Sequence, residues 1–303
     1  MLNPILAFSA TRRMRSFRTL LVAGAYLLVM LLTAALMLSR LMGDTVSVNA
    51  VRAGVTCYRV LLILQFVLIV LISPAMASGA IAGERERQTL ELLLVTNTRS
   101  LRIVTGKVME TFAMLALLVC VGFPVMCLTL LAGAVTFPQI LLGEAFLLVM
   151  AFASASVGVL ASSLARSTVI SSVLGYIFLM GIGLVSLLPV LGEVPAEVTE
   201  IVYDSSRLAA LKSGEALKMI PPLLFLNPGY ALASLLQGQT GMFTSLMQYH
   251  EMGRLQCSLR LMERAGGETV ALISCGAILV LALLLLPAAA ALVRRSTMSR
   301  RGK

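Results

Sequence analysis

Six long apolar runs, separated by polar segments, dominate the hydrophobic pattern of this chain. They occupy residues 20–38, 60–82, 108–131, 140–162, 169–190 and 270–293. A helix rises about 1.5 Å per residue, so about 20 apolar residues cross the hydrocarbon layer of a bilayer. Each run has about that length, and none carries a charge at its centre. The pattern predicts an all-α membrane protein with six transmembrane helices.

The composition supports a membrane location and excludes a soluble enzyme of this size. Of the 303 residues, 59% are hydrophobic and 13% are charged, whereas soluble domains have roughly 45–50% apolar residues. The net charge of +10 would suggest nucleic-acid binding in a soluble protein. Here the basic residues lie mostly between and outside the apolar runs, so membrane topology explains them and we expect no nucleic-acid partner.

The positions of Lys and Arg predict the orientation of the chain. Short segments before the first run, between runs two and three, between runs four and five, and after run six hold fifteen of the 24 basic residues. Short cytoplasmic segments carry such an excess of positive charge. We therefore expect both termini to be cytoplasmic.

The first 18 residues have the pattern of an amphipathic helix. Asn3 and Pro4 suit a helix start as N-cap and first helical residue. Apolar side chains recur on one face at helical spacing, and basic side chains lie on the other face and at its flanks. The membrane-interface residues expected from this pattern are Arg12, Arg13, Arg15, Phe17 and Arg18. Such a helix lies on membrane lipids at the inner leaflet; a basic tail that only sets the orientation is the alternative.

A long loop at residues 191–268 is expected outside the cytoplasm and contains a further apolar stretch, residues 219–236. A seventh span would place the basic C-terminus outside. The stretch is also interrupted in its middle by Asn227-Pro228-Gly229, and proline breaks a continuous helix. We expect a re-entrant or interfacial helical hairpin. Small residues are frequent in runs four and five, which predicts close helix packing there.

The segment between runs two and three, residues 83–107, is the most informative part of the sequence. Residues 83–96 read Gly-Glu-Arg-Glu-Arg-Gln-Thr-Leu-Glu-Leu-Leu-Leu-Val-Thr. Alternating charges lead into an apolar helical run of about two turns, which is too short to span a bilayer. It is also too apolar to remain free in water. It must therefore dock on the membrane surface or in a groove of a partner protein.

This segment, followed by Lys107 in Thr-Gly-Lys-Val, resembles the first cytoplasmic loop of ABC-2 type transporter permeases. The whole layout is similar, from the basic N-terminal helix to the Asn-Pro break before the last span and the basic tail. The resemblance implies a single ABC-2 transmembrane domain over residues 1–303. Gln88 stands where glycine is usual in the family, and Asn97 stands where proline is usual. The outer loop is longer than in the simplest members.

The resemblance also implies a function. In that family the short helix is a coupling helix that sits in a cleft of a separate ATPase subunit. The coupling interface implied here consists of Glu84, Arg85, Glu86, Thr89, Leu90, Glu91 and Leu92. The sequence contains no GxxxxGK[ST] phosphate loop, so we expect another polypeptide to bind and hydrolyse ATP. The chain is then the permease subunit of an exporter, itself without enzymatic activity or cofactor. It would pair with an identical or homologous permease in the bacterial cytoplasmic membrane.

Glu110 and Glu144 are acidic residues near the ends of two runs. We expect each to reach its nearer interface, with a place on a transport path as the alternative. An ion-coupled secondary transporter using these two carboxyls is the second function considered. An intramembrane enzyme is the third, although no run contains Asp, His or an HExxH pair.

One group of soft metal ligands lies in the outer loop. Met247, His250, Met252 and Cys257 are donor types that copper favours. They have no fixed spacing, and 17 methionines occur in the chain. An ordinary loop histidine explains the group better, so no metal site is predicted.

Overall fold

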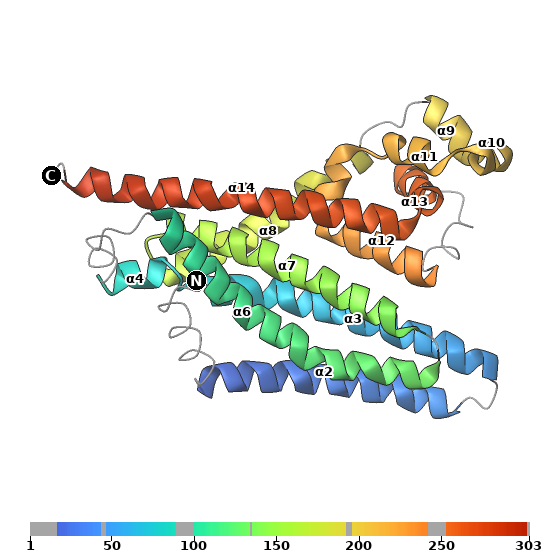
Figure 1. Cartoon of the computed structure of the whole chain (residues 1–303), viewed down its shortest axis with the longest axis horizontal. Coiled ribbons are helices and arrows are strands. Elements are labelled where there is room, and N and C mark those ends of the chain that lie inside the picture. Colours follow the sequence, from blue (N-terminus) through green and yellow to red (C-terminus); the bar gives the residue numbers. More distant parts are fainter. Residues whose placement is uncertain are drawn as a thin grey trace. The chain divides into compact units, whose positions relative to one another are not determined.

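The computed structural model describes residues 17–43, 47–88, 100–133, 135–191, 196–241 and 253–301, and all regular elements in these ranges are helical. Six helices are long and apolar enough to cross a membrane (Figure 1). They are α2 (Phe17–Gly43), α3 (Ser47–Ala77), α6 (Ser100–Cys127), α7 (Phe137–Leu164), α8 (Thr168–Leu191) and α14 (Gly267–Arg301). The prediction of an all-α protein with six membrane-spanning helices is confirmed.

The chain divides into two compact units. The first comprises residues 1–179 and 279–303, and the second comprises residues 180–278. Helices α8 and α14 each contribute residues to both units. The second unit contains the described parts of the segment that the sequence places in the outer loop.

Helix α7 is the centre of the first unit. It packs against α3 and α6, and α2 packs against α3 and α6 (Figure 1). Within the candidate membrane-spanning window of each helix, 67% of the residues are buried in α7 and 11% are buried in α8. Apolar side chains of α8, such as Val169 and Met180, are exposed. A helix that is apolar on all sides in a membrane protein exposes such side chains to lipid.

Local sequence explains where these helices begin and end. Thr136 is the N-cap of helix α7; its backbone N–H donates to Gln139 Oε1 at 2.9 Å, and Pro138 lies in the first turn. This is the reciprocal arrangement of a capping box. The 3-10 helix η1 (Leu128–Ala132) continues α6 and ends at Gly133, whose φ of 63° is left-handed and suits glycine.

Two glycines allow close packing of the membrane-spanning helices. A Cβ added at Gly158 of α7 would lie 2.5 Å from the Cβ of Ala77 on α3, and one added at Gly175 of α8 would lie 2.9 Å from Pro74 Cβ. Both contacts are shorter than side chains permit, so the backbones approach closely only because glycine stands there. By contrast, Gly181 has no such neighbour within 4 Å. Close helix packing therefore depends on some of the small residues in α7 and α8, namely Gly158 and Gly175, and not on Gly181.

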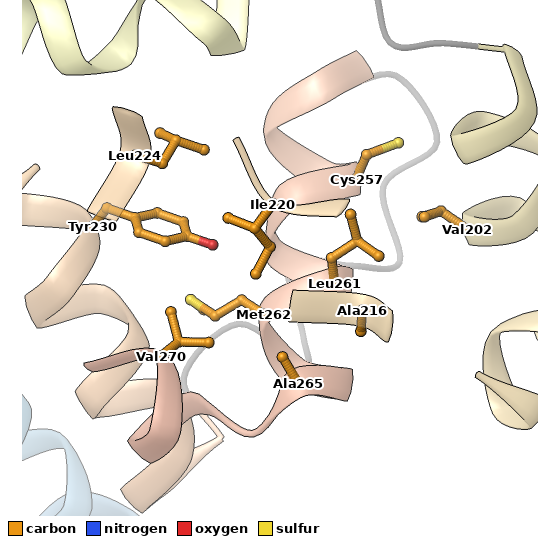
Figure 2. Packing of buried hydrophobic residues seen from close by; sticks show 10 residues of the cluster. All are labelled: Val202, Ala216, Ile220, Leu224, Tyr230, Cys257, Leu261, Met262, Ala265 and Val270. Atoms are coloured by element: carbon orange, nitrogen blue, oxygen red, sulfur yellow. The ribbon is translucent and has the colours of Figure 1, made fainter. Parts of the chain in front are cut away.

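The second unit has its own hydrophobic core. Its helices are α9 (Ala196–Tyr203), α10 (Ser205–Ala210), α11 (Ser213–Met219), the 3-10 helix η2 (Pro222–Leu226), α12 (Pro228–Thr240) and α13 (Gly253–Ala265), with the adjoining parts of α8 and α14. Side chains of α13 such as Leu261 and Met262 converge with Ile220 and Tyr230 (Figure 2). Burial raises the pKa of the Tyr230 hydroxyl, and that hydroxyl donates to Ser258 O at 3.4 Å. The unit is thus a small helical cluster with a packed interior.

Asn227 breaks the apolar stretch of the second unit where the sequence predicts a break. Its Oδ1 accepts from Tyr230 N at 2.9 Å and caps α12, while its Nδ2 donates to Gly183 O and Ser186 Oγ of α8, both at 2.9 Å. The stretch therefore forms η2, a break and α12 rather than one helix. A similar cap starts α10, where hydrogen bonds from Ser206 lower the pKa of Asp204.

Other predicted features fall partly outside the described residues. Arg12, Arg13 and Arg15 lie outside them, and Phe17 and Arg18 begin α2 without described side chains. Met247, His250 and Met252 also lie outside. Cys257 is packed in the core of the second unit, where burial raises the pKa of its thiol. Within the described ranges, no cluster of three or more His, Cys, Asp or Glu side chains could hold a metal ion.

Candidate functional site

The charged segment after α3 is fastened to the helices around it. The chain leaves α3 at Ala77, passes through a turn, and forms the short helix α4 (Ala82–Glu86). The residues that hold α4 in place form what we call the α4 junction. They are Glu84, Arg85, Glu86, Lys107, Ser162 and Thr168.

Ser162, near the end of α7, holds the turn before α4. Its hydroxyl accepts hydrogen bonds from the backbone N–H groups of Ile81 and Ala82, both at 3.0 Å, and donates to Ser78 O at 2.9 Å. The first N–H groups of a helix lack partners within the helix. One fully buried hydroxyl from α7 satisfies two of them here, so the position of α4 is tied to α7.

Arg85 fastens α4 to the C-terminal end of α7. Its Nη2 donates to Ser163 O at 3.2 Å, and its Nη1 donates to Ala165 O. The last carbonyls of a helix have no partners within the helix and carry partial negative charge. A guanidinium satisfies two of them at once because its donors form a fixed planar fork.

Glu86 makes the opposite contact with the next helix. Its Oε1 accepts from Thr168 N at 2.9 Å, at the first residue of α8, and lies 3.4 Å from Thr168 Oγ1. A carboxylate is favourable at a helix N-terminus, where unpaired N–H groups carry partial positive charge. Arg85 thus lies at the partial negative charge of the α7 C-terminus, and the adjacent Glu86 lies at the partial positive charge of the α8 N-terminus.

Glu84 connects α4 to α6 through Lys107. The Lys107 ammonium lies 2.5 Å from Glu84 Oε1 and 3.3 Å from Glu110 Oε2. The Lys107 and Glu84 side chains are each 19% exposed and Glu110 is 6% exposed, so these ion pairs are partly shielded from water and salt. A short helix of five residues is in this way attached to α6, α7 and α8.

The turn that follows α4 has a left-handed backbone. Gln88 has φ of 58°, the one positive value at a non-glycine position in the described ranges. Side chains with a Cβ are disfavoured in this region by roughly 1–2 kcal/mol. This conformation gives a physical reason why glycine is usual at this position in the family that the sequence resembles.

The structure places the predicted site residues in three groups. Glu84, Arg85 and Glu86, expected at a partner's surface, direct their described contacts at helices of this chain. Thr89, Leu90, Glu91 and Leu92 lie outside the described residues.

Glu110 contacts Lys107 of the α4 junction, and Glu144 lies inside the bundle beside Gln65 of α3. Sequence reasoning favoured interface positions for both. Their side chains are 6% and 5% exposed; Glu110 pairs with Lys107 of its own helix, and Glu144 faces α3. Their depth in the membrane stays a prediction.

Sequence reasoning missed Ser162, Thr168 and Gln65. These residues lie about 80 positions from their partners in the chain, and none belongs to a recognisable motif. The short apolar run that follows the alternating charges of residues 84–87 indicated that this segment docks, but it did not reveal which surface receives the charged residues.

The six apolar helices define a multi-pass membrane protein. Its charged segment at residues 84–86 is attached to α6, α7 and α8. The chain belongs to the ABC-2 transporter family, since the family described as "ABC-2 family transporter protein" matches residues 5–299. Comparison with curated proteins finds no match. Membership makes the chain an ABC permease, the membrane component of a transporter. It does not favour the ion-coupled carrier or the intramembrane enzyme.

Proposed function

We propose that this chain is the membrane subunit of an ABC exporter and that the α4 junction transmits the force of a separate ATPase to the membrane helices. The single observation that carries this proposal is the attachment of α4 to α6, α7 and α8 through Glu84, Arg85 and Glu86. A push on the residues that follow α4 would reach three helices together.

The roles within the segment differ under this proposal. Glu84, Arg85 and Glu86 form the inner face of the coupling segment, because their described partners belong to the same chain. Thr89, Leu90, Glu91 and Leu92 form the face that enters the ATPase, in keeping with the short apolar run of the sequence. Burial of an apolar helix face in a groove of a soluble protein is a recurrent mode of recognition.

The assembly contains two permease subunits, identical or homologous, and two ATPase subunits below them. It resides in the cell membrane with both chain termini in the cytoplasm, and the basic residues 12–18 lie on the inner leaflet. ATP-driven closure of the ATPases biases the permease pair between inward-facing and outward-facing states. The substrate leaves the cytoplasm along the interface of the two permeases.

Substitutions in the outer face of the coupling segment test the proposal. Leu90→Asp or Glu91→Arg should uncouple ATP hydrolysis from transport, because each places an unfavourable charge in the ATPase groove. The measurement is ATPase activity and subunit association after purification of the full chain in mild detergent with a co-expressed protein that contains a phosphate loop.

The matched control is Glu200→Arg, a charge reversal on the exposed surface of α9 in the second unit. Normal association and normal coupling in both Leu90→Asp and Glu91→Arg would refute the proposal. Loss of both in the Glu200→Arg control would show that charge reversal acts through misfolding.

A further inference from the structure

A cluster of polar side chains lies buried between α2, α3, α6 and α7, away from the α4 junction. It consists of Tyr26, Gln65 and Glu144, whose side chains are 2%, 0% and 5% exposed. Gln65 Nε2 donates to both carboxyl oxygens of Glu144, at 3.2 Å and 3.4 Å. Helix α6 contributes Gly122 to the cluster, about 18 Å along the helix from Glu110 at a rise of about 1.5 Å per residue.

Gly122 leaves the space in which the cluster converges. A Cβ at this position would lie 2.8 Å from Gln65 Nε2 and 2.9 Å from Tyr26 Oη. Two polar groups from different helices therefore meet the backbone of α6 at one point. The arrangement is built around a position without a side chain.

Two buried oxygen atoms of the cluster have no hydrogen-bond partner. They are Gln65 Oε1 and the Tyr26 hydroxyl oxygen. A buried polar atom without a partner is unfavourable, and such atoms are uncommon in native structures. Gln65 Oε1 thus accepts no hydrogen bond of normal geometry, although the Tyr26 hydroxyl lies beside the Gln65 side chain.

The groups that face Glu144 do not balance a negative charge. Tyr26 faces it from α2, Gln65 from α3, and the thiol of Cys127 lies within electrostatic range at the end of α6. None of these groups is a cation, and no basic side chain in the described ranges forms an ion pair with Glu144. A buried carboxylate without a counter-charge is strongly unfavourable, and taking up a proton removes that penalty.

We propose that Glu144 is a proton-binding site and that Gln65 changes its hydrogen bonds when the proton binds. In the ionised form, Gln65 Nε2 donates to both carboxylate oxygens, as observed. In the protonated form, the new O–H donates to Gln65 Oε1 while Nε2 donates to the other oxygen. The proton comes from water and returns to water, and no covalent bond other than O–H is made or broken.

The protonated pair satisfies the orphaned amide oxygen and holds α3 and α7 together by two reciprocal hydrogen bonds. Loss of the proton removes the hydrogen bond to Gln65 Oε1 and introduces a charge between the helices. Proton binding therefore favours the closely packed arrangement of α3 and α7. The proton is a second ligand, in addition to the ATP-driven cycle, and the inference does not depend on the identity of the ATPase or the substrate.

Infrared difference spectroscopy on the chain alone tests this inference. The full chain is reconstituted in nanodiscs of phosphatidylcholine and phosphatidylglycerol and titrated from about pH 4 to pH 9, a range that includes the ordinary glutamate value of about 4.3. We expect a carboxylic-acid C=O band that persists at neutral pH in the unaltered chain. The band should be lost in Glu144→Gln and retained in Glu110→Gln, which removes a similarly buried carboxyl beside Lys107.

A second variant keeps the test decisive if Glu144→Gln does not fold. In Gln65→Met the same band should shift to higher frequency, because the acid carbonyl loses the amide donor. An acid band that is unchanged by both Glu144→Gln and Gln65→Met would overturn the inference. So would a spectrum of the unaltered chain with carboxylate bands alone at every pH in the range.

Discussion

Arg85 shows how a single residue shapes the loop junction. Its guanidinium satisfies two backbone carbonyls at the end of α7, Ser163 O and Ala165 O. Hydrogen bonds that involve a charged group contribute about 1.5–3 kcal/mol each. Side chains that form such contacts between distant segments therefore determine where a short helix such as α4 rests.

At this scale we predict that Arg85→Met lowers the apparent melting temperature of the purified chain in detergent, by the equivalent of about 2 kcal/mol. The melting temperature of Arg85→Lys should lie between those of the unaltered chain and Arg85→Met, because a single ammonium lacks the planar fork of donors. The control is Arg207→Met in the second unit, where an exposed arginine forms surface ion pairs with Glu200 and Asp204. Such pairs contribute about 0–1 kcal/mol. Equal melting temperatures for Arg85→Met and Arg207→Met would contradict the assigned role.

At the scale of elements, close contact between α3 and α7 is the main feature of the first unit. It depends on Gly158, whose position leaves no room for a Cβ beside Ala77. The Gln65–Glu144 contact joins the same two helices elsewhere along their length. Changes in the spacing of α3 and α7 would therefore affect both positions.

We predict that Gly158→Ala destabilises the chain by about 1–3 kcal/mol, the usual effect of overpacking a dense interface. Gly181→Ala on α8 should be neutral or slightly stabilising, since it has open space and alanine favours a helix. Melting temperature in detergent is the measurement for both. The double variant Gly158→Ala with Ala77→Gly should recover part of the loss. A Gly158→Ala variant as stable as Gly181→Ala would show that the two helices do not approach this closely.

At the scale of the whole molecule, the functional proposal depends on the orientation in the membrane. The proposed orientation places the α4 junction in the cytoplasm, where it can receive an ATPase, and residues 191–268 are predicted to be extracytoplasmic. The excess of Lys and Arg in the four short segments supports this orientation. The α4 junction contains two of the basic residues counted there, Arg85 and Lys107.

We predict that Glu215→Cys, at an exposed position of α11 in the second unit, reacts with a membrane-impermeant maleimide added to intact cells. Ser299→Cys, in the basic C-terminal segment, should react only after the membrane is permeabilised. The chain with its five native cysteines measures the background. External labelling of Ser299→Cys in intact cells would reverse the orientation and exclude the α4 junction as an ATPase contact.

Much of the fold could be predicted because membrane insertion depends on local sequence. A run of about 20 apolar residues partitions into a bilayer whatever its neighbours are, so all six spans could be read from the sequence. The break at Asn227 could also be predicted, because Pro228 and the Asn227 cap act within one helical turn. The docking of residues 83–96 was likewise predicted from a local feature, the short apolar run after the charges, and it stays a prediction.

The contacts of the candidate site could not be predicted in this way. Which surface receives Glu84, Arg85 and Glu86 depends on the ends of α6, α7 and α8. The burial of Glu144 depends on how α7 is rotated against α3. Hydrophobicity determined by itself that this chain crosses the membrane and which segments do so. Only the tertiary structure decided which polar side chains meet between the helices, because helix rotation and spacing result from packing among residues far apart in the sequence.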